Sequence, residues 1–291
     1  MKKKLNFKGI FLDSGAFSAH MKNEPIDLDK YIDFIKQYEE GITHYANLDV
    51  IGDAKGTWKN QRKMEKAGLT PLPVFHIGED FKYMDRCMEY DYFCIGGMAR
   101  IGQPDRVAFL DKCFSIICDT PKKLPNSKVH AFGMTNLKLL TRYPWYSADS
   151  TTWLLSASMG EVYIPIFREG QPIYTKYTPL NISTRMKYTT EMHYCSIPAK
   201  FKAKVDKYVS SLGFPIGKSK FRERDLDYEL KDNEKVVKKN EDSKEVETLL
   251  ELGLTNDRDM RLAINMIFFI QFEKAIPQWP FAFNNFKTEL F

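Results

Sequence analysis

Three aspartates in the first half of the chain each follow a short apolar run, where a strand of a sheet would end. Asp13 lies in Leu-Asp-Ser-Gly-Ala-Phe-Ser, Asp49 in Ala-Asn-Leu-Asp-Val-Ile-Gly-Asp and Asp149 in Ser-Ala-Asp-Ser-Thr-Thr-Trp. Two carboxylates that face one site can carry out glycosidic chemistry, because one attacks the anomeric carbon while the other moves protons. The alternative for each aspartate is a helix N-cap, but three caps at the same edge of one sheet are a weaker explanation.

Other residues near the expected strand ends could hold a flat heterocycle. The third aspartate carboxylate could accept hydrogen bonds from the edge of a guanine. The pair Gly96-Gly97 would let backbone N–H groups approach a ligand oxygen, although such a pair is often only a tight turn. Phe17 and Phe132 could stack on the two faces of a ring, or else belong to the core. His76 could donate to a base carbonyl, or else be a core histidine bonded to the backbone.

A regular alternation of apolar runs and amphipathic stretches positions these residues. Expected strands cover residues 9–12, 45–48, 71–75, 91–95, 128–132 and 145–148, and expected helices cover 27–40, 55–67, 80–90, 104–118 and 136–141. Apolar positions at helical spacing, Gly68 as a C-cap and Pro104 in a first turn support the helices. Such an alternation predicts an α/β fold with a parallel sheet covered by helices.

Two architectures compete for this pattern, a closed barrel and an open doubly wound sheet. No Gly-x-Gly-x-x-Gly follows the first strand, which disfavours a dinucleotide-binding sheet. Polar residues at the carboxyl end of every strand favour a barrel, because a barrel builds its active site there. We therefore expect a (β/α)8 TIM-type barrel, as a single domain over residues 1–291.

The second half of the chain is less regular. Residues 161–177 alternate around Gly170 as a hairpin would, within an expected insertion over 150–190, and a basic amphipathic helix is expected from Ala199 to Leu212. Residues 218–247 carry both charge signs in balance, which predicts a charged, solvated insertion or mobile arm. An apolar helical pattern follows from Leu249 to Phe272, and we expect the segment 248–291, with its aromatic tail, to pack on the barrel.

Composition excludes several classes of protein. The chain has 291 residues, 43% of them hydrophobic, and no apolar run approaches the roughly 20 residues of a membrane helix. No signal-peptide core follows the basic N-terminus, and five cysteines without a Cys-x-x-Cys pair do not form a disulfide framework. We expect a cytoplasmic protein with reduced thiols, whose net charge of +5 permits contact with nucleic acid without requiring it.

An ordered set of motifs resembles the tRNA-guanine transglycosylases. Asp-Ser-Gly-Ala-Phe-Ser at 13–18 is similar to the family's Asp-Ser-Gly-Gly-Phe/Tyr-Gln motif, and Ile-Gly-Gly-Met-Ala at 95–99 to its Gly-Gly-Leu-Ala turn. His-Ala-Phe-Gly-Met at 130–134 resembles the Tyr-Leu-Met-Gly-Val strand, and Ala-Asp-Ser at 148–150 falls where the family has its Phe-Asp-Cys nucleophile. The resemblance covers residues 7 to 155, about half of the chain.

This resemblance implies a base exchange in which Asp149 is the nucleophile and Asp13 the general acid/base. Guanine leaves C1′, a covalent sugar–enzyme intermediate forms, and a free 7-deazaguanine base, such as 7-cyano-7-deazaguanine, replaces it. No cofactor is implied. The implied substrate contacts are the guanine edge at Asp49, the base carbonyl at Gly96, Gly97 and His76, stacking at Phe17 and Phe132, and a further contact at Ser14.

The chain departs from the tRNA enzymes in one respect. Those enzymes carry a zinc site of Cys-x-Cys-x2-Cys and a distant His, and this sequence has no such set. We therefore expect no metal site, and DNA rather than tRNA as the polymer, because the motif set looks most like the phage and bacterial DNA-guanine transglycosylases. A tRNA enzyme, a two-carboxylate nucleoside or glycoside hydrolase and a non-catalytic nucleic-acid-binding module are the alternatives.

A polymer substrate would have to cross the carboxyl ends of the strands, so basic residues there are candidates for phosphate contacts. These are Lys55, Lys59, Arg62 and Arg100. The first three fall at i, i+4 and i+7 and can share one helix face, for which the alternative is a solvated face. A paired base would also have to be flipped out of the duplex or supplied in a single strand.

Overall fold

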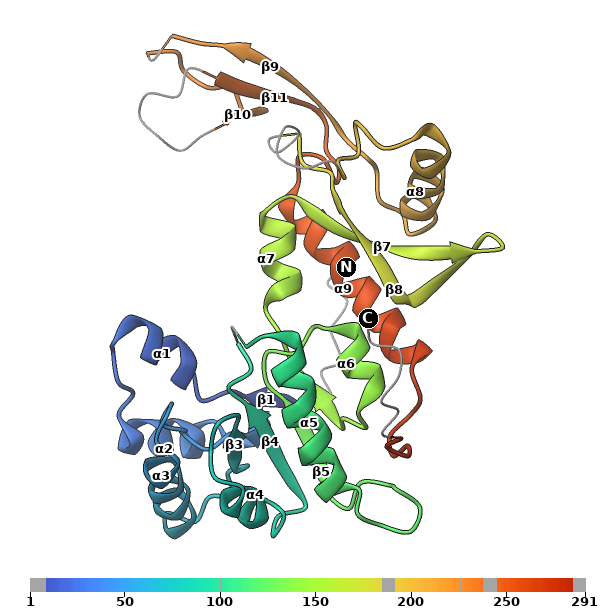
Figure 1. Cartoon of the computed structure of the whole chain (residues 1–291). Coiled ribbons are helices and arrows are strands. Elements are labelled where there is room, and N and C mark those ends of the chain that lie inside the picture. Colours follow the sequence, from blue (N-terminus) through green and yellow to red (C-terminus); the bar gives the residue numbers. More distant parts are fainter. Residues whose placement is uncertain (1–8, 100, 185–191, 226, 238–244, 285–291) are drawn as a thin grey trace. The chain divides into compact units, whose positions relative to one another are not determined.

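The computed structural model describes residues 9–99, 101–184, 192–225, 227–237 and 245–284, and it divides the chain into two compact units (Figure 1). The first unit comprises residues 1–150 and 278–291, and the second comprises residues 151–277. The expectation of a single domain is therefore replaced by two units, which are described separately. No helix among the described residues has the length and apolar character needed to cross a membrane.

The first unit contains parallel strands arranged in the order of the chain. They are β1 (Ile10–Leu12), β2 (Ile42–Tyr45), β3 (Val74–His76), β4 (Tyr92–Gly96), β5 (Lys128–Ala131) and β6 (Ser147–Ala148). β1 pairs with β2, β3 to β6 pair in sequence, and a parallel bridge between Ala46 and Leu72 connects the two groups. A doubly wound sheet reverses its strand order at a switch point, and this order shows no reversal.

The sheet of the first unit is strongly curved. The ring of Phe11 on β1 stacks on His130 of β5, with 4.3 Å between ring centroids and 19° between ring planes. In a flat sheet, strands four places apart would be separated by about 19 Å, so β1 has to face β5 across a concave surface. The α/β class with a parallel sheet is confirmed, whereas the ladders among the described residues do not join β6 to β1 in a closed ring.

Helices cover the outer face of this sheet (Figure 1). They are α1 (Ala16–Lys22), α2 (Leu28–Gln37), the 3-10 turn η1 (Glu39–Gly41), α3 (Ala54–Lys66), α4 (Lys82–Cys87), α5 (Gln103–Ile117) and α6 (Leu137–Arg142). The largest core lies between α3, α4, α5 and the outward side chains of β3 to β5, among them Phe75, Phe93 and Val129. Phe283 of the tail also belongs to this core, where it contacts Phe114 and Tyr143.

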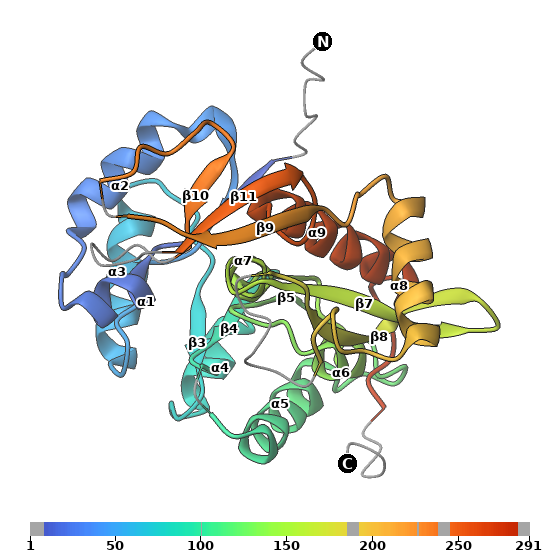
Figure 2. The same ribbon diagram turned by 90° about the horizontal axis from the view of Figure 1, so that it is seen from above.

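The second unit is built on an antiparallel hairpin, as the alternation around Gly170 predicts. β7 (Glu161–Arg168) pairs with β8 (Gln171–Asn181), and α7 (Thr152–Ser158) and α9 (Arg258–Ala275) pack against it (Figure 2). Asn265 of α9 accepts a hydrogen bond from the backbone N–H of Tyr163 and donates to the carbonyl of Glu161. Within the second unit, the partners of α9 are therefore the hairpin and α7. The basic helix α8 (Ala199–Ser211) is found where it was expected.

The charged segment 218–247 forms strands in its described part, and most of their side chains are exposed or half-buried. β9 (Lys218–Glu223), β10 (Glu234–Val236) and β11 (Glu245–Glu251) form an antiparallel sheet in the order β10-β11-β9. Glu234 is only 8% exposed and accepts hydrogen bonds from Arg222 and Tyr228, so opposite charges satisfy each other within the sheet. The helix expected from Leu249 begins later, at Arg258, because β11 extends to Glu251.

Candidate active site

A cavity of about 380 Å³ opens on the concave face of the first unit. Asp13 and Asp149 lie on its wall, and the remaining polar and aromatic lining comes from Phe11, Thr43, His44, Tyr92, His130, Phe132, Tyr146 and Ser147. Side chains alternate between the two faces of a strand. Residues two positions apart, such as 11 and 13, 130 and 132, or 147 and 149, therefore point to the same side and bring the site together.

None of the three strand-end aspartates caps a helix. α1 begins after Gly15 and α7 after Thr151, both without a side-chain cap, and α3 is capped by Asp53. The N-cap explanation is therefore wrong for all three. The charges of Asp49 and Asp149 both act on the carboxyl of Asp13, which shows that the three groups lie within electrostatic reach of one another.

Asp149 follows β6 and is held by one of its two oxygens. Oδ1 accepts a 3.0 Å hydrogen bond from the N–H of Gly133 and lies 3.3 Å from Nε2 of His130, a contact whose angle is poorer than that of a regular hydrogen bond. Burial raises the pKa of this carboxyl, but His130 and the N–H of Gly133 outweigh it and leave the pKa below its usual value. The side chain is 48% exposed, so an ionised carboxylate faces the cavity.

Asp13 follows β1, and its environment shifts the pKa of its carboxyl in the direction opposite to that of Asp149. It is open to solvent on the cavity side, but protein atoms surround the carboxylate on its other sides. This burial raises the pKa of Asp13 above its usual value, the charges of Asp149 and Asp49 raise it further, and the N–H groups of Gly15 and Ser14 only partly oppose them. Asp13 is therefore the carboxyl of the pair that more readily keeps a proton.

Asp49 belongs to a largely buried network of hydrogen bonds and ion pairs around His76. Ser14 Oγ donates to its Oδ1 at 2.9 Å, and Nε2 of His76 lies 3.0 Å from its Oδ2. The other ring nitrogen of His76 lies 3.2 Å from Glu79. Burial lowers the pKa of His76, but the two carboxylates outweigh it and raise the pKa to about 9. His76 is therefore an imidazolium at neutral pH, and neither ring nitrogen is left to donate to a base.

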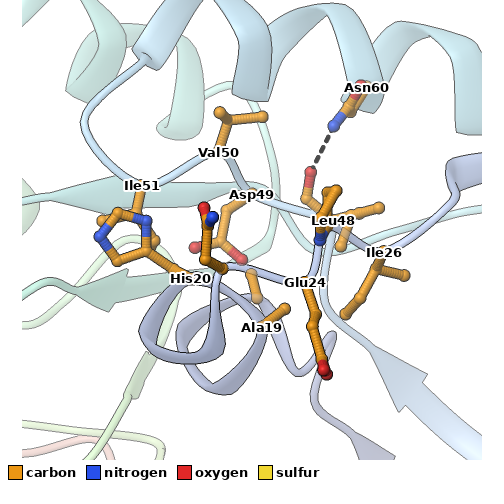
Figure 3. Close-up of a pocket in the computed structure, with 12 residues that line it drawn as sticks. Ala19, His20, Glu24, Ile26, Leu48, Asp49, Val50, Ile51 and Asn60 are labelled. Carbon is orange, nitrogen blue, oxygen red and sulfur yellow. Dashed lines mark hydrogen bonds between the residues drawn. The ribbon is translucent and has the colours of Figure 1, made fainter.

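Asp49 lines a second, separate cavity of about 280 Å³ (Figure 3). His20 and Ala19 of α1, Glu24 and Ile26 from the loop after it, and the loop that follows β2 form its walls. Figure 3 shows Asn60 of α3 at the edge, where its amide donates to the carbonyl of Leu48 at 2.8 Å. The structure therefore separates Asp49 from the cavity that Asp13 and Asp149 share.

The remaining predicted substrate residues are only partly brought together. Phe132 lines the first cavity, whereas Phe17 is 52% exposed and lines neither. At Gly96 an added Cβ would lie 3.2 Å from the ring of His76, and Gly97 has a φ of +76°. Close approach to His76 and backbone conformation thus explain both glycines, and their contacts with a base stay predictions.

The predicted phosphate-binding residues lie on α3, except for one. Lys55, Lys59 and Arg62 are exposed there, and Arg62 forms a 3.0 Å ion pair with Glu65. Arg100 lies outside the described residues. Among the residues that the structure describes, no three His, Cys, Asp or Glu side chains are arranged to hold a metal ion.

Sequence reasoning missed several residues on the strands that precede the predicted site residues. Tyr92, His130 and Ser147 face the cavity and form hydrogen bonds that lead to Asp149. Their signal is the period of two in strands that end at a predicted site residue, as in His130 before Phe132 and Ser147 before Asp149.

Comparisons of the chain with protein-family models, curated proteins and solved structures find no match.

Proposed function

We propose that this chain is a glycosyltransferase that exchanges a base on a nucleic acid, with Asp149 as nucleophile and Asp13 as general acid/base. One observation carries the proposal: two carboxylates share a cavity wall while their surroundings displace their pKa values in opposite directions. Such a divergence divides the roles of nucleophile and proton donor between two otherwise identical groups.

The two half-reactions use these groups in turn. Asp149 attacks C1′ of the sugar, the C1′–N9 bond breaks, and its electron pair leaves with guanine as Asp13 delivers a proton to the departing base. An ester then joins Asp149 to the sugar. The incoming base loses its N9 proton to Asp13, N9 attacks C1′, and the carboxylate of Asp149 is released.

The ordered motifs around Asp13, Gly96, Phe132 and Asp149 favour guanine as the leaving base and a 7-deazaguanine, such as 7-cyano-7-deazaguanine, as the incoming one. Phe132 would stack on the base. The absence of a Cys-x-Cys-x2-Cys motif from the sequence favours DNA over tRNA as the polymer. The proposal does not include the predicted contact of Asp49 with the guanine edge, because Asp49 lines the second cavity and its two oxygens face Ser14 and His76.

We also propose that the six parallel strands of the first unit are the first six strands of a barrel of the (β/α)8 type. Chain-order pairing without reversal and the stacking of Phe11 on His130 support this proposal. In such a barrel the carboxyl ends of the strands form the active-site face, where Asp13 and Asp149 follow their strands.

The test is incorporation of labelled guanine into DNA or into tRNA. We expect exchange with DNA, a wild-type protein–DNA adduct that survives denaturing gels, and neither exchange nor adduct with Asp149→Ala. Asp91→Asn is the matched control, because Asp91 is exposed and precedes β4 at the other end of the sheet. Robust exchange by Asp149→Ala would refute the nucleophile assignment.

The same experiment separates the alternatives. Exchange with tRNA alone would identify a tRNA enzyme. Release of free base or sugar without incorporation would identify a two-carboxylate hydrolase. Binding of DNA without exchange or adduct would identify a non-catalytic module.

A further inference from the structure

Two hydrogen bonds link Tyr92, Ser147 and His130, and a close contact joins His130 to Asp149. The hydroxyl of Tyr92 on β4 lies 2.6 Å from Oγ of Ser147 on β6, which lies 2.6 Å from Nδ1 of His130 on β5. Nε2 of the same ring is the atom 3.3 Å from Oδ1 of Asp149. Tyr92 and His130 are only 8% and 3% exposed, so these two rings are largely screened from bulk water.

The direction of these hydrogen bonds follows from the donors present. Ser147 is the polar partner of the Tyr92 hydroxyl among the described residues, so the buried O–H is satisfied by donating to Oγ. Burial raises the pKa of Tyr92 to about 12, so the phenol keeps its proton at neutral pH. The single proton of Ser147 is then directed at Nδ1 of His130. An imidazole that accepts at Nδ1 carries its proton on Nε2, the nitrogen that faces Asp149.

We propose that Tyr92 and Ser147 hold His130 as its Nε2–H tautomer, and that His130 is a positioning residue that fixes Oδ1 of Asp149 and leaves Oδ2 to attack the sugar. This inference rests on the proposed function. The N–H of Gly133 binds the same Oδ1, and no other described residue donates a hydrogen bond to Oδ2.

Packing keeps the imidazole in this orientation. Phe11 stacks on the ring at 4.3 Å, and Phe132 meets it edge-on at 4.7 Å and 77°. Two rings set nearly at right angles prevent rotation of His130 out of the line between Ser147 and Asp149. The same two donors on Oδ1 stabilise the carboxylate again when it leaves the sugar in the second half-reaction.

The first test does not depend on activity. The nitrogen chemical shifts of the histidine rings, assigned to His130 by comparison with His130→Gln, report which nitrogen carries a proton. We expect a protonated Nε2 and an unprotonated Nδ1 in wild type at neutral pH, and a mixture of tautomers in Ser147→Ala. A wild-type ring protonated on Nδ1, whether neutral or cationic, would overturn the proposal.

The second test measures the rate of adduct formation in a single turnover beside the Kd for DNA. Tyr92→Phe and Ser147→Ala should each slow adduct formation about tenfold, as expected for one hydrogen bond, with Kd unchanged. The double variant should be no slower than Ser147→Ala, because Tyr92 acts through Ser147. His130→Gln should retain more activity than His130→Ala, since its carboxamide can still donate to Asp149.

Tyr45→Phe is the matched control, because the Tyr45 hydroxyl contacts the hydroxyl of Thr70 at 3.3 Å in a partly buried pair outside the cavity. It should leave adduct formation unchanged, and equal slowing in Tyr45→Phe and Tyr92→Phe would overturn the inference.

Wild-type rates in the His130 variants would refute the inference alone, whereas no adduct in wild type would refute the proposed function and the inference with it. Labelling of Ser147 by a fluorophosphonate would show that this serine is the activated group and would also overturn the proposal.

Discussion

Raising the pH should weaken the first unit through His76, whose imidazolium lies between Asp49 and Glu79. Burial alone lowers the pKa of His76, but the two carboxylates raise it from 6.5 to about 9. A group whose pKa is raised on folding contributes stability that is complete below the unfolded pKa and is lost as the pH rises through the folded pKa. The loss should therefore fall between about pH 6.5 and 9.

The size of the loss follows from these two values. The difference between them corresponds to about 3 kcal/mol of unfolding free energy at acidic pH. About 2 kcal/mol of this contribution remains at about pH 7.5 and less than about 1 kcal/mol at about pH 9. The free energy of unfolding should thus fall by about 1–2 kcal/mol over this interval, which for a unit of this size lowers Tm by about 3–6 °C.

Thermal and urea unfolding at the two pH values can measure this change. Tryptophan fluorescence is a suitable probe, because Trp58, Trp145 and Trp279 all belong to the first unit. Wild type should lose stability between the two pH values, and His76→Gln should not show that part of the loss. His20→Gln, at an exposed histidine of α1, should behave as wild type. Equal pH dependence in wild type and His76→Gln would show that the imidazolium does not stabilise the fold.

Three further outcomes are expected. Asp149→Asn should retain at most a trace of exchange, measured with labelled guanine, because its carboxamide is a poor nucleophile; exchange near the wild-type rate would contradict this. Replacing Lys55, Lys59 and Arg62 together should weaken DNA binding for every sequence alike and flatten its salt dependence by about one unit of slope per lost phosphate contact; superimposable salt titrations would show that DNA lies elsewhere. Phe283→Ala should destabilise the first unit by about 3–5 kcal/mol in urea unfolding, since it opens a cavity beside Phe114 and Tyr143, and an unchanged midpoint would show that the tail does not support this core.

Local periodicity was sufficient to predict much of the first unit. Apolar residues at helical spacing predicted α2, α3 and α5 to within a few residues, and Asp27 caps α2 through the N–H groups of Asp29 and Lys30. The period of two in the strands also explains why Asp13 and Asp149 share one face. These features depend on neighbours in the chain, which is why the sequence alone could predict them.

The charge pattern of residues 218–247 did not predict the strands that the segment forms. A balance of acidic and basic residues is typical of a solvated segment, but cross-strand pairing places Arg222 beside Glu234 and converts part of the segment into a sheet. Pairing of this kind joins residues far apart in the sequence, and composition carries no record of it.

By itself, the sequence determined the alternating elements of the first unit, their chain order and the aspartates that follow its strands. Only the tertiary structure decided what surrounds each aspartate: Asp149 contacts His130 and Gly133, Asp13 is partly desolvated near two other carboxylates, and Asp49 contacts Ser14 and His76. Asp13 and Asp149, two residues of one type, thus have pKa values displaced in opposite directions. The physical reason is that desolvation and hydrogen bonding act through contacts between strands, which exist only once the sheet has curved.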